Sequence, residues 1–260
     1  MTFTDTHCHI HEESYPDSEA AYQRALEAGV KRLLVVGTDL KSSHEAVQFA
    51  SSHTGAWAVI GIHPHEAARD GDKVEELRRM VSSSHRLVGI GEIGLDYYYA
   101  HSPREIQIET LECQIDLALK YHLPISFHVR DGLSSEGSTS VWNDFWPIFD
   151  NFKGLRGVLH SYTDNLSNME KALTRGLYTG VNGIATFAKD KQTLYQVIPP
   201  TKILLETDSP YLTPHPHRGT INEPALLKHV AKHIANLQSI NLQELSRATE
   251  ASATTLFNLK

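Results

Sequence analysis

The sequence predicts an α/β protein of the (β/α)8 TIM-barrel class with an extra helix near its C-terminal end. Short apolar, β-branched runs alternate eight times with amphipathic stretches of helical length. This is the pattern of repeated strand and helix units around a parallel sheet. No linker or change of composition interrupts the series, and about 250 residues is the usual length of a closed barrel of such units.

The expected strands are short and begin with the first residues of the chain. They cover residues 2–10, 31–37, 57–62, 87–93, 125–129, 157–160, 178–181 and 202–207. A doubly wound open sheet is the alternative arrangement of the same units. A dinucleotide fold of that kind carries a glycine-rich loop after its first strand. No such loop follows residue 10, so we favour the barrel and expect one domain over residues 1–260.

The expected helices alternate with the strands and carry end signals. They cover residues 18–28, 42–52, 73–83, 104–121, 138–151, 166–175, 190–197 and 223–236, and a ninth covers 242–257. Gly29 and Gly176 follow two of these helices, where a left-handed residue commonly ends a helix. Pro103 stands where another helix begins. No strand follows the ninth helix, which is the extra element.

Composition and charge narrow the class of protein. Of the 260 residues, 40% are hydrophobic and 21% charged, as in an ordinary globular protein. The sequence has 24 Lys and Arg and 31 Asp and Glu. This excess of acidic residues argues against a broad basic surface that coats nucleic acid. The apolar runs are far shorter than the about 20 residues of a membrane helix, and the first residues lack signal-peptide features. We therefore expect a cytoplasmic protein without membrane contact.

The stretch Asp-Thr-His-Cys-His at residues 5–9 places two histidines two positions apart on the first expected strand. Because side chains alternate along a strand, His7 and His9 share one face and Cys8 lies on the other. We predict that both imidazoles bind one metal ion and that Cys8 packs in the core. His11 lies beyond the expected strand end and is not expected to be a ligand.

Polar side chains also follow four other expected strands where their apolar runs stop. They are Glu92, His128, His160, and the pair Glu206 and Asp208. In a TIM barrel the carboxyl ends of the strands carry the catalytic residues, so their coincidence predicts one shared site. Glu206 and Asp208 share a strand face, and the sequence alone does not decide which is the ligand. The position nearer the mouth favours Asp208.

Four imidazoles and two carboxylates exceed the about four ligands of one tetrahedral ion, so we expect two divalent ions. The first would take His7, His9 and Asp208, the second His128 and His160, with Glu92 bridging them. An ion pair activates a shared water for in-line displacement, and Asp208 is placed to accept its proton. Imidazole ligands suit Zn or Mn, whereas phosphate chemistry often uses Mg. We expect Zn or Mn, with Mg as the alternative.

Four further residues are candidate substrate contacts. The planar guanidinium of Arg130 suits a phosphate, and His63 and His65 can donate to a nonbridging oxygen. Arg218 is a further candidate. An ion pair with a nearby aspartate, at position 131 or 164, is the alternative role of Arg130.

A run of three tyrosines at residues 97–99 follows the fourth expected strand. Tyrosine rings at the rim of a nucleic-acid site can stack on bases. A run of three more often divides between packing and solvent. The sequence leaves both interpretations open.

These motifs together resemble the TatD family of metal-dependent deoxyribonucleases, within the amidohydrolase superfamily. The matching stretches lie at residues 5–9, 61–65, 91–97, 128–131, 160 and 206–211. The resemblance implies a TIM barrel of the metallo-dependent hydrolase type and phosphodiester hydrolysis, with exonuclease action on single-stranded DNA. It implies Asp208 and Glu92 as catalytic carboxylates and a divalent-metal site of His7, His9, Glu92, His128, His160 and Asp208. The implied partner is a nucleic-acid end, and no obligate protein partner is evident.

Two segments depart from the family pattern. Ser161-Tyr162 stands where the family commonly has Cys-Phe, and uncharged Thr220-Ile221 precedes Asn222 where a charged pair is common. The absence of that charge and the net charge of −7 favour an alternative, a hydrolase of a small phosphoester, amide or lactone that uses the same centre. A non-catalytic metal-binding protein is the least expected reading, because the predicted ligands leave a place for water.

Overall fold

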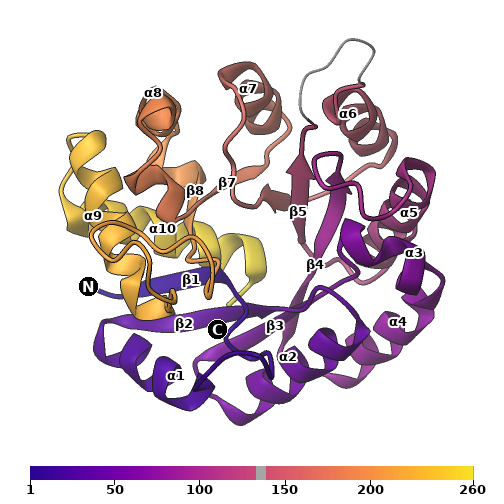
Figure 1. Ribbon diagram of the computed structural model, residues 1–260, viewed down its shortest axis with the longest axis horizontal. Helices are drawn as coiled ribbons and strands as arrows, with labels where there is room; N and C mark the ends of the chain where they lie inside the picture. The colour runs from indigo at the N-terminus through magenta and orange to yellow at the C-terminus, as the bar shows by residue number, and fades with distance from the viewer. Residues whose placement is uncertain (133–138, 260) are drawn as a thin grey trace.

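Eight parallel strands follow one another around a barrel in the computed structural model, which describes residues 1–132 and 139–259 (Figure 1). The strands are β1 (Phe3–Cys8), β2 (Val30–Val36), β3 (Ala56–Ile60), β4 (Leu87–Asp96), β5 (Ile125–Arg130), β6 (Gly157–Leu159), β7 (Tyr178–Val181) and β8 (Ile203–Leu205). They are hydrogen-bonded in chain order from β1 to β8. The prediction of a (β/α)8 barrel is confirmed.

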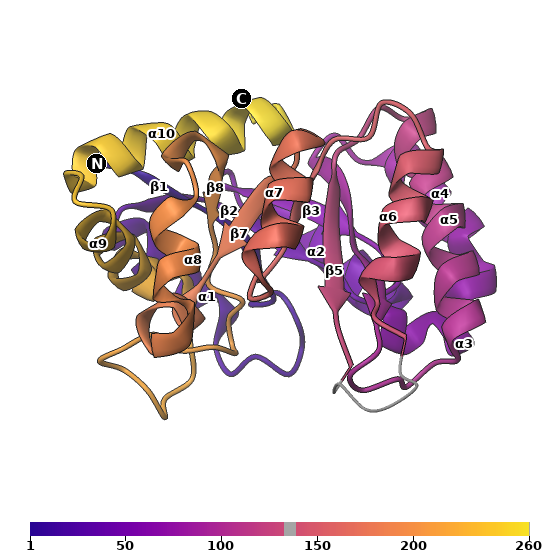
Figure 2. The ribbon, with the colours of Figure 1, turned by 90° about the horizontal axis from the view of Figure 1, so that it is seen from above.

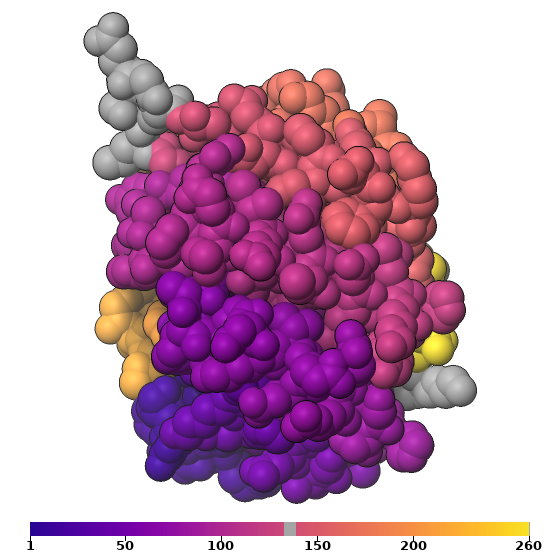
Figure 3. All heavy atoms as spheres, turned by 90° about the vertical axis from the view of Figure 1, so that its right-hand side faces the viewer, coloured from indigo at the N-terminus to yellow at the C-terminus, as the bar shows by residue number. Residues whose placement is uncertain are grey.

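Helices cover the outside of the barrel in chain order (Figure 1). In the space-filling view the surface colour runs in the same order, from indigo at the bottom through magenta to orange at the top (Figure 3). They are α1 (Ser18–Glu27), α2 (Leu40–Ser52), α3 (Ala67–Asp70), α4 (Val74–Ser83), α5 (Arg104–Lys120), α6 (Trp142–Asn151), α7 (Leu166–Thr174), α8 (Gln192–Val197), α9 (Leu227–Leu237) and α10 (Leu242–Phe257). Within the described ranges, none is long and apolar enough to cross a bilayer.

The helices differ most from the prediction at three places, and their other boundaries agree with it to within two residues. The sequence analysis missed α3, because four residues are too few to show a helical period. The helix expected at 223–236 begins at Leu227, after a 3-10 turn that starts at Pro224. The helix expected at 138–151 begins at Trp142, and residue 138 lies outside the described residues.

Side-chain caps fix the starts of several helices. The carboxylates of Asp17 and Asp39 and the amide oxygens of Asn165 and Asn241 each accept a main-chain N–H from the first turn of the following helix. At α2 the cap is reciprocal, because the hydroxyl of Ser42 also accepts the N–H of Asp39. Such caps stabilise a helix by about 1 kcal/mol each.

The barrel closes between β8 and β1, where distant segments of the sequence meet. The carbonyl oxygen of His7 accepts the main-chain N–H of Asp208 at 2.9 Å, and the carbonyl oxygen of Ser209 accepts that of His9 at 2.8 Å. The main chain therefore holds the His-x-His stretch directly beside Asp208.

The barrel interior is apolar at one end and polar at the other. The apolar half is built by side chains of the strands together with α10: Leu34, Val36, Trp57, Val59, Val158, Leu204, Ala253, Leu256, Phe257 and Leu259. Figure 2 shows α10 lying across this end, opposite the long loops that follow the strands. The apolar side chains of α10 thus fill the barrel at the amino ends of the strands, and the polar half opens at their carboxyl ends.

The face occupied by Cys8 depends on an irregularity in β1. The register between β1 and β2 shifts between Asp5 and Cys8. As a result Phe3 and Cys8, an odd- and an even-numbered residue, both pack in the core between the sheet and the helices. The predicted core position of Cys8 is confirmed, and the neighbouring histidines face the interior of the barrel.

Candidate metal centre

The six predicted ligands meet at the carboxyl ends of the strands. A cavity of about 640 Å³ opens there and is lined by His9, Glu92, His128, His160 and Asp208, among others. His7 is fully buried, and its Nε2 lies 3.3 Å from Oε2 of Glu92. Segments separated by as many as two hundred residues in the sequence thus supply side chains to one cluster.

The first group of ligand atoms surrounds the carboxylate of Asp208. Its Oδ1 lies 3.4 Å from Nε2 of His9, 3.7 Å from Nε2 of His160 and 4.0 Å from Nε2 of His7. Ligand atoms of His7, His9 and Asp208 all lie within 4.8 Å of one another, so that one ion can contact all three. This is the first of the two groupings expected from the sequence.

The second group surrounds Glu92 and differs from the expected one. Oε1 of Glu92 lies 2.7 Å from Nδ1 of His128, 3.7 Å from Nε2 of His63 and 3.8 Å from Nε2 of His160. Ligand atoms of His63, Glu92 and His128 lie within 4.8 Å of one another. His63 therefore occupies the place beside His128 where the sequence analysis put His160, which lies between Glu92 and Asp208.

Glycine in β4 permits the close approach of β4 to β5 on which this group depends. At Gly94 the φ angle is +156°, and a Cβ atom would collide with the carbonyl oxygen of His128. β4 also runs to Asp96, three residues beyond its predicted end at 93. The extended strand carries Glu92 and Asp96 to opposite nitrogens of the His128 ring.

Three imidazoles are held through one ring nitrogen and present the other to the centre. Nδ1 of His9 donates to the carbonyl oxygen of Val36 at 2.7 Å, and Nδ1 of His160 donates to Oε2 of Glu206 at 3.0 Å. Nδ1 of His7 faces the hydroxyl of Ser126 at 3.4 Å. Protein contacts of this kind orient the histidine ligands of metal sites, and they leave the Nε2 atoms directed at the carboxylates.

The contacts of Glu206 separate its role from that of Asp208. Glu206 accepts hydrogen bonds from Nδ1 of His160 and from the main-chain N–H of Ser161. One of its oxygens lies within 4.8 Å of ring nitrogens of His7 and His160, but Glu206 is not among the described residues that line the cavity. β8 ends at Leu205, and the chain turns at Asp208, whose φ is +57°. The two carboxylates that share a face on an ideal strand therefore diverge, and Asp208 alone enters the cavity.

His63 is oriented as a hydrogen-bond donor. Its Nδ1 accepts the main-chain N–H of His65 at 3.1 Å. Burial and the neighbouring His128 hold the pKa of His63 well below its usual range, so the ring is neutral. A neutral ring that accepts at Nδ1 carries its proton on Nε2. His63 thus directs an N–H, rather than a lone pair, toward Glu92.

Asp96 links this centre to the rim of the cavity. The side chain is fully buried, and Oδ2 contacts Nε2 of His128 at 2.9 Å and Nε2 of His65 at 3.1 Å. Oδ1 accepts the main-chain N–H groups of Tyr98 and Tyr99. The sequence analysis assigned no role to Asp96, although its position in the 91–97 motif was a usable signal.

Asp5 is a second buried carboxylate that the sequence analysis did not assign. Oδ1 accepts main-chain N–H groups of His7 and Thr207, and Oδ2 accepts the hydroxyl of Thr207 at 2.5 Å. Asp5 therefore joins β1 to the segment after β8. The position of Asp5 two residues before His7 was the available signal in the sequence. Periodicity cannot reveal that its partner is Thr207, about two hundred residues away.

Glu92 and Asp208 remain ionised and draw protons onto the surrounding imidazoles, whereas burial raises the pKa of Asp5 to about 7. Burial alone raises the pKa of Glu92, but neighbouring imidazoles, His160 first, hold it well below its usual range. Burial alone lowers the pKa of His160, whereas Glu206 and Glu92 raise it to about 10. Burial likewise opposes charge on His9, yet Asp208 raises its pKa to about 9. Divalent cations bound here would replace these protons.

The buried nitrogen of His7 supports the fit of the centre to metal ions. Burial and the ring of His160, stacked at 3.5 Å between centroids, lower the pKa of His7. Its Nε2 has no hydrogen-bond partner among the described residues, although it faces two carboxylates. Buried polar atoms without a partner are rare in folded proteins. A neutral imidazole in this position fits a metal ligand.

The predicted substrate contacts divide between the cavity and the loop beyond it. His63, His65 and Arg130 line the cavity. Arg218 is absent from this lining, because its guanidinium donates to the carbonyl oxygen of Thr213 and lies 4.0 Å from the ring centre of Phe187.

Arg130 forms neither of the ion pairs considered from the sequence. Asp131 accepts hydrogen bonds from Ser140 and Val141, and Asp164 accepts one from Asn168. Within the described residues no carboxylate pairs with Arg130, which is exposed at the cavity.

Comparison with known proteins agrees with this geometry. The family described as TatD related DNase matches residues 4–258. An uncharacterized metal-dependent hydrolase, YabD of Bacillus subtilis strain 168, is 33% identical over 258 residues, with 98% of each chain covered. The 3'-5' ssDNA/RNA exonuclease TatD of Shigella flexneri serotype 5b is 32% identical over 251 residues, with 94% of each chain covered.

A solved structure extends the match to the fold. The crystal structure of YJJV, a TatD homologue from Escherichia coli K12, aligns with a TM-score of 0.88 and 27% identity, covering 99% of this chain and 98% of that one. The phosphotriesterase homology protein of Escherichia coli, at 14% identity, shares the fold with a TM-score of 0.71. The sequence, the fold and the residues gathered at the barrel mouth agree, and the chain belongs to the TatD-related DNase family.

Proposed function

We propose that this protein is a metal-dependent phosphodiesterase that removes nucleotides from the 3' end of single-stranded nucleic acid. The observation that carries the proposal is the orientation of three imidazoles, from His7, His9 and His160, whose Nε2 atoms converge on the carboxylate of Asp208. The name 3'-5' ssDNA/RNA exonuclease, carried by relatives that are 32 and 33% identical, supports the choice of substrate and direction.

Two divalent ions fit the donor atoms of the centre. The ligands of one ion would be His7, His9 and Asp208. Those of the other would be His128 and His160, whose ring nitrogens lie 2.7 and 3.8 Å from Oε1 of Glu92, the carboxylate shared by both groups. His63 would stay outside the ligand set, because it directs an N–H to Glu92. When bound, such ions lower the pKa of a water molecule and polarise a phosphoryl oxygen. The imidazole-rich donor set favours Zn or Mn over Mg.

The chain's own residues supply proton transfer and phosphate positioning. Oδ1 of Asp208, which the nearby imidazoles keep ionised, accepts the proton of the attacking water. The Nε2–H of His63 donates to a nonbridging phosphoryl oxygen. Arg130 lies at the mouth without a carboxylate partner among the described residues, and it attracts the anionic backbone of the strand.

The test is cleavage of end-labelled single strands by the metal-loaded protein. DNA and RNA oligonucleotides carry a fluorophore at the 5' end, and products are separated by electrophoresis after Zn, Mn or Mg is added to chelator-treated protein. We expect a ladder that shortens one nucleotide at a time from the 3' end. The His9→Ala variant should lose the ladder, whereas His85→Ala, an exposed histidine at the other end of the barrel, should keep it.

Each contrary outcome has a definite meaning. A panel of small phosphoesters, amides and lactones is assayed with the same preparations. Turnover of these compounds without cleavage of any strand would replace the nuclease proposal by that of a small-molecule hydrolase. No hydrolysis of either panel, with metal bound as measured by mass spectrometry, would remove the enzymatic proposal.

A further inference from the structure

Two tyrosines and an arginine form a stack at the rim of the cavity. The guanidinium carbon of Arg130 lies 4.3 Å from the ring centre of Tyr98 and 4.7 Å from that of Tyr99. The two rings are 4.9 Å apart and nearly perpendicular, at 82°. We call these three side chains the rim stack. Tyr99 and Arg130 line the same cavity as the metal centre.

The rim stack exposes large rings that the fold does not bury. Tyr98 is 43% and Tyr99 51% exposed, although aromatic rings usually supply much of a protein's buried apolar area. Tyr97 behaves differently, because its hydroxyl donates to Asp144 at 2.6 Å and its ring packs against the core. The tyrosine run thus divides into one structural residue and two half-exposed rings. The ring of Tyr99 also lies parallel to that of His101, with 5.7 Å between the ring centres.

The turn that carries these rings is fixed to the metal centre. Oδ1 of Asp96 accepts the N–H of Tyr98 at 3.0 Å and that of Tyr99 at 2.8 Å, while Oδ2 of the same carboxylate contacts His128. A preformed turn loses less conformational entropy when a ligand binds. The exposed rings are therefore presented at a set position relative to the centre.

We propose that the rim stack binds one base of a single strand beside the cleaved phosphodiester. The base stacks on Tyr99, and the guanidinium of Arg130, which the ring of Tyr98 holds at 4.3 Å, contacts the adjoining phosphate. Every base has an aromatic face, so stacking of this kind accepts any sequence. In a duplex both faces of an internal base are covered by its neighbours, so the same contact selects single-stranded ends. This proposal rests on the proposed nuclease function.

The experiment removes the ring and the base separately. Tyr99→Ala and Tyr99→Phe are compared with the unaltered protein on three oligonucleotides, one intact and two that each carry an abasic residue at one of the two 3'-terminal positions. Loss of stacking should raise the KM of Tyr99→Ala on the intact strand by about 5- to 150-fold. The kcat should change little, and Tyr99→Phe should remain close to the unaltered protein.

The abasic strand supplies the decisive comparison. If the rim stack contacts a base, the unaltered protein loses the same factor on one of the abasic strands, and Tyr99→Ala loses nothing further there. Tyr121→Ala is the matched control, because this tyrosine lies at the other end of the barrel and also has a cation near its ring, Nζ of Lys120 at 5.9 Å. Its KM should not change.

The results separate this inference from the function on which it rests. Hydrolysis of methyl p-nitrophenyl phosphate, a diester without a base, should be equal in Tyr99→Ala and the unaltered protein. If the unaltered protein cleaves strands but Tyr99→Ala loses the same factor on intact and abasic strands, the stacking site is wrong and the nuclease stands. If the unaltered protein cleaves no strand, both proposals fall.

Discussion

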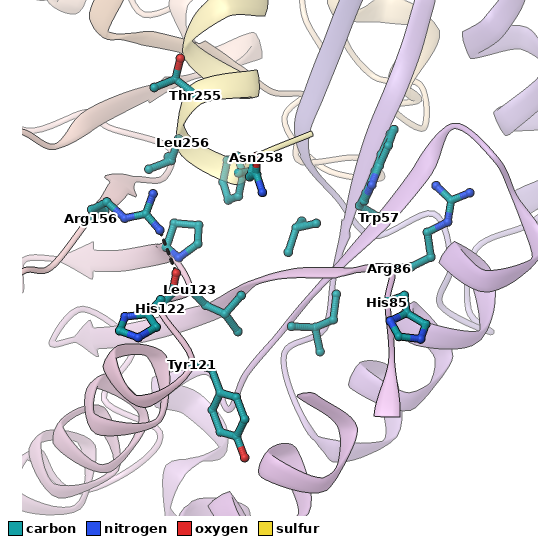
Figure 4. Close-up of a pocket in the computed structure, with 14 residues that line it drawn as sticks. Trp57, His85, Arg86, Tyr121, His122, Leu123, Arg156, Thr255, Leu256 and Asn258 are labelled. Atoms are coloured by element: carbon teal, nitrogen blue, oxygen red, sulfur yellow. Dashed lines mark hydrogen bonds between the residues drawn. The ribbon is translucent and has the colours of Figure 1, made fainter. Parts of the chain in front are cut away.

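The two ends of the barrel each hold a cavity, and they differ in chemistry more than in size. The two cavities are similar in size, about 770 Å³ at the amino ends of the strands and about 640 Å³ at the carboxyl ends. Trp57, Arg86, Tyr121, Arg156 and Asn258 surround it (Figure 4). No carboxylate is among its described lining residues, and no described group of three metal-binding side chains lies there. Donor chemistry, not volume, therefore marks the functional end.

The two arginines at the amino end of the barrel donate hydrogen bonds to main-chain carbonyl oxygens. Arg156 donates to the carbonyl oxygen of His122 at 2.8 Å, as the dashed line in Figure 4 shows, and Arg86 donates to that of Thr54 at 3.0 Å. These bonds hold loops that precede strands. At the carboxyl end the polar side chains instead face one another across open space, where a ligand can enter. The following four predictions test this division, in decreasing order of effect on turnover.

Asp208→Asn should have the largest effect on turnover. The amide cannot accept the proton of the attacking water as the carboxylate does, so kcat should fall by about 10²- to 10⁴-fold. The main-chain bond from Asp208 to His7 remains, and circular dichroism should be unchanged. Single-turnover cleavage of a labelled strand at saturating metal gives the rate. Retention of more than a tenth of the activity would exclude Asp208 as the base.

Glu206→Gln should weaken metal binding without removing a ligand. Glu206 holds His160 through Nδ1, and loss of such an orienting carboxylate typically costs about 10- to 100-fold in affinity. Competition with a chromophoric chelator measures the dissociation constant. The matched control is Glu250→Gln on α10, where the carboxylate pairs with Arg32 at the amino end. Equal affinity in both variants would contradict the orienting role.

Phe257→Ala should destabilise the fold and leave the kcat of the folded protein unchanged. Phe257 is 2% exposed within the apolar half of the barrel, and truncation of such a ring costs about 3–5 kcal/mol of unfolding free energy. Urea denaturation monitored by fluorescence gives that value. The kcat of the folded fraction should match the unaltered protein. A tenfold lower kcat in fully folded protein would show that the two ends are not independent.

Arg86→Ala combined with Arg156→Ala should have the smallest effect. Each guanidinium makes a hydrogen bond to a carbonyl oxygen in a partly exposed setting, so we expect about 1 kcal/mol of destabilisation for each. Neither kcat nor KM for a single strand should change. Strand binding that weakens in the double variant, measured by fluorescence anisotropy, would give the cavity at the amino ends a role in substrate recognition.

Local patterns were sufficient to predict most of the fold. The strand at 178–181 and the helix at 242–257 have the predicted boundaries, because Gly176 ends the preceding helix and the last helix shows a clear apolar period. β8 is shorter than expected, ending at Leu205, because Thr207 leaves the strand to bond Asp5. The prediction that His7 and His9 face the same way agrees with the structure. The register shift within β1, between Asp5 and Cys8, has no signal in the sequence.

The details of the centre depend on contacts between distant segments and could not be read from local patterns. Strand alternation gave Glu206 and Asp208 the same face, and only the turn at Asp208 separates them. His63 belongs to the cluster because its Nδ1 accepts the main-chain N–H of His65, which directs its Nε2 toward Glu92. Arg218 was a plausible phosphate contact by charge, yet its loop packs it on Phe187.

One carboxylate, Asp96, is shared by a proposed metal ligand and by the turn that bears the rim stack. Any free energy transmitted through it obeys thermodynamic linkage, so a strand that binds more tightly because the ions are present must by the same factor lower the dissociation constant of the ions. An enzyme built in this way retains its ions best while engaged with a polymer, and a chelator would act most strongly on the idle molecule.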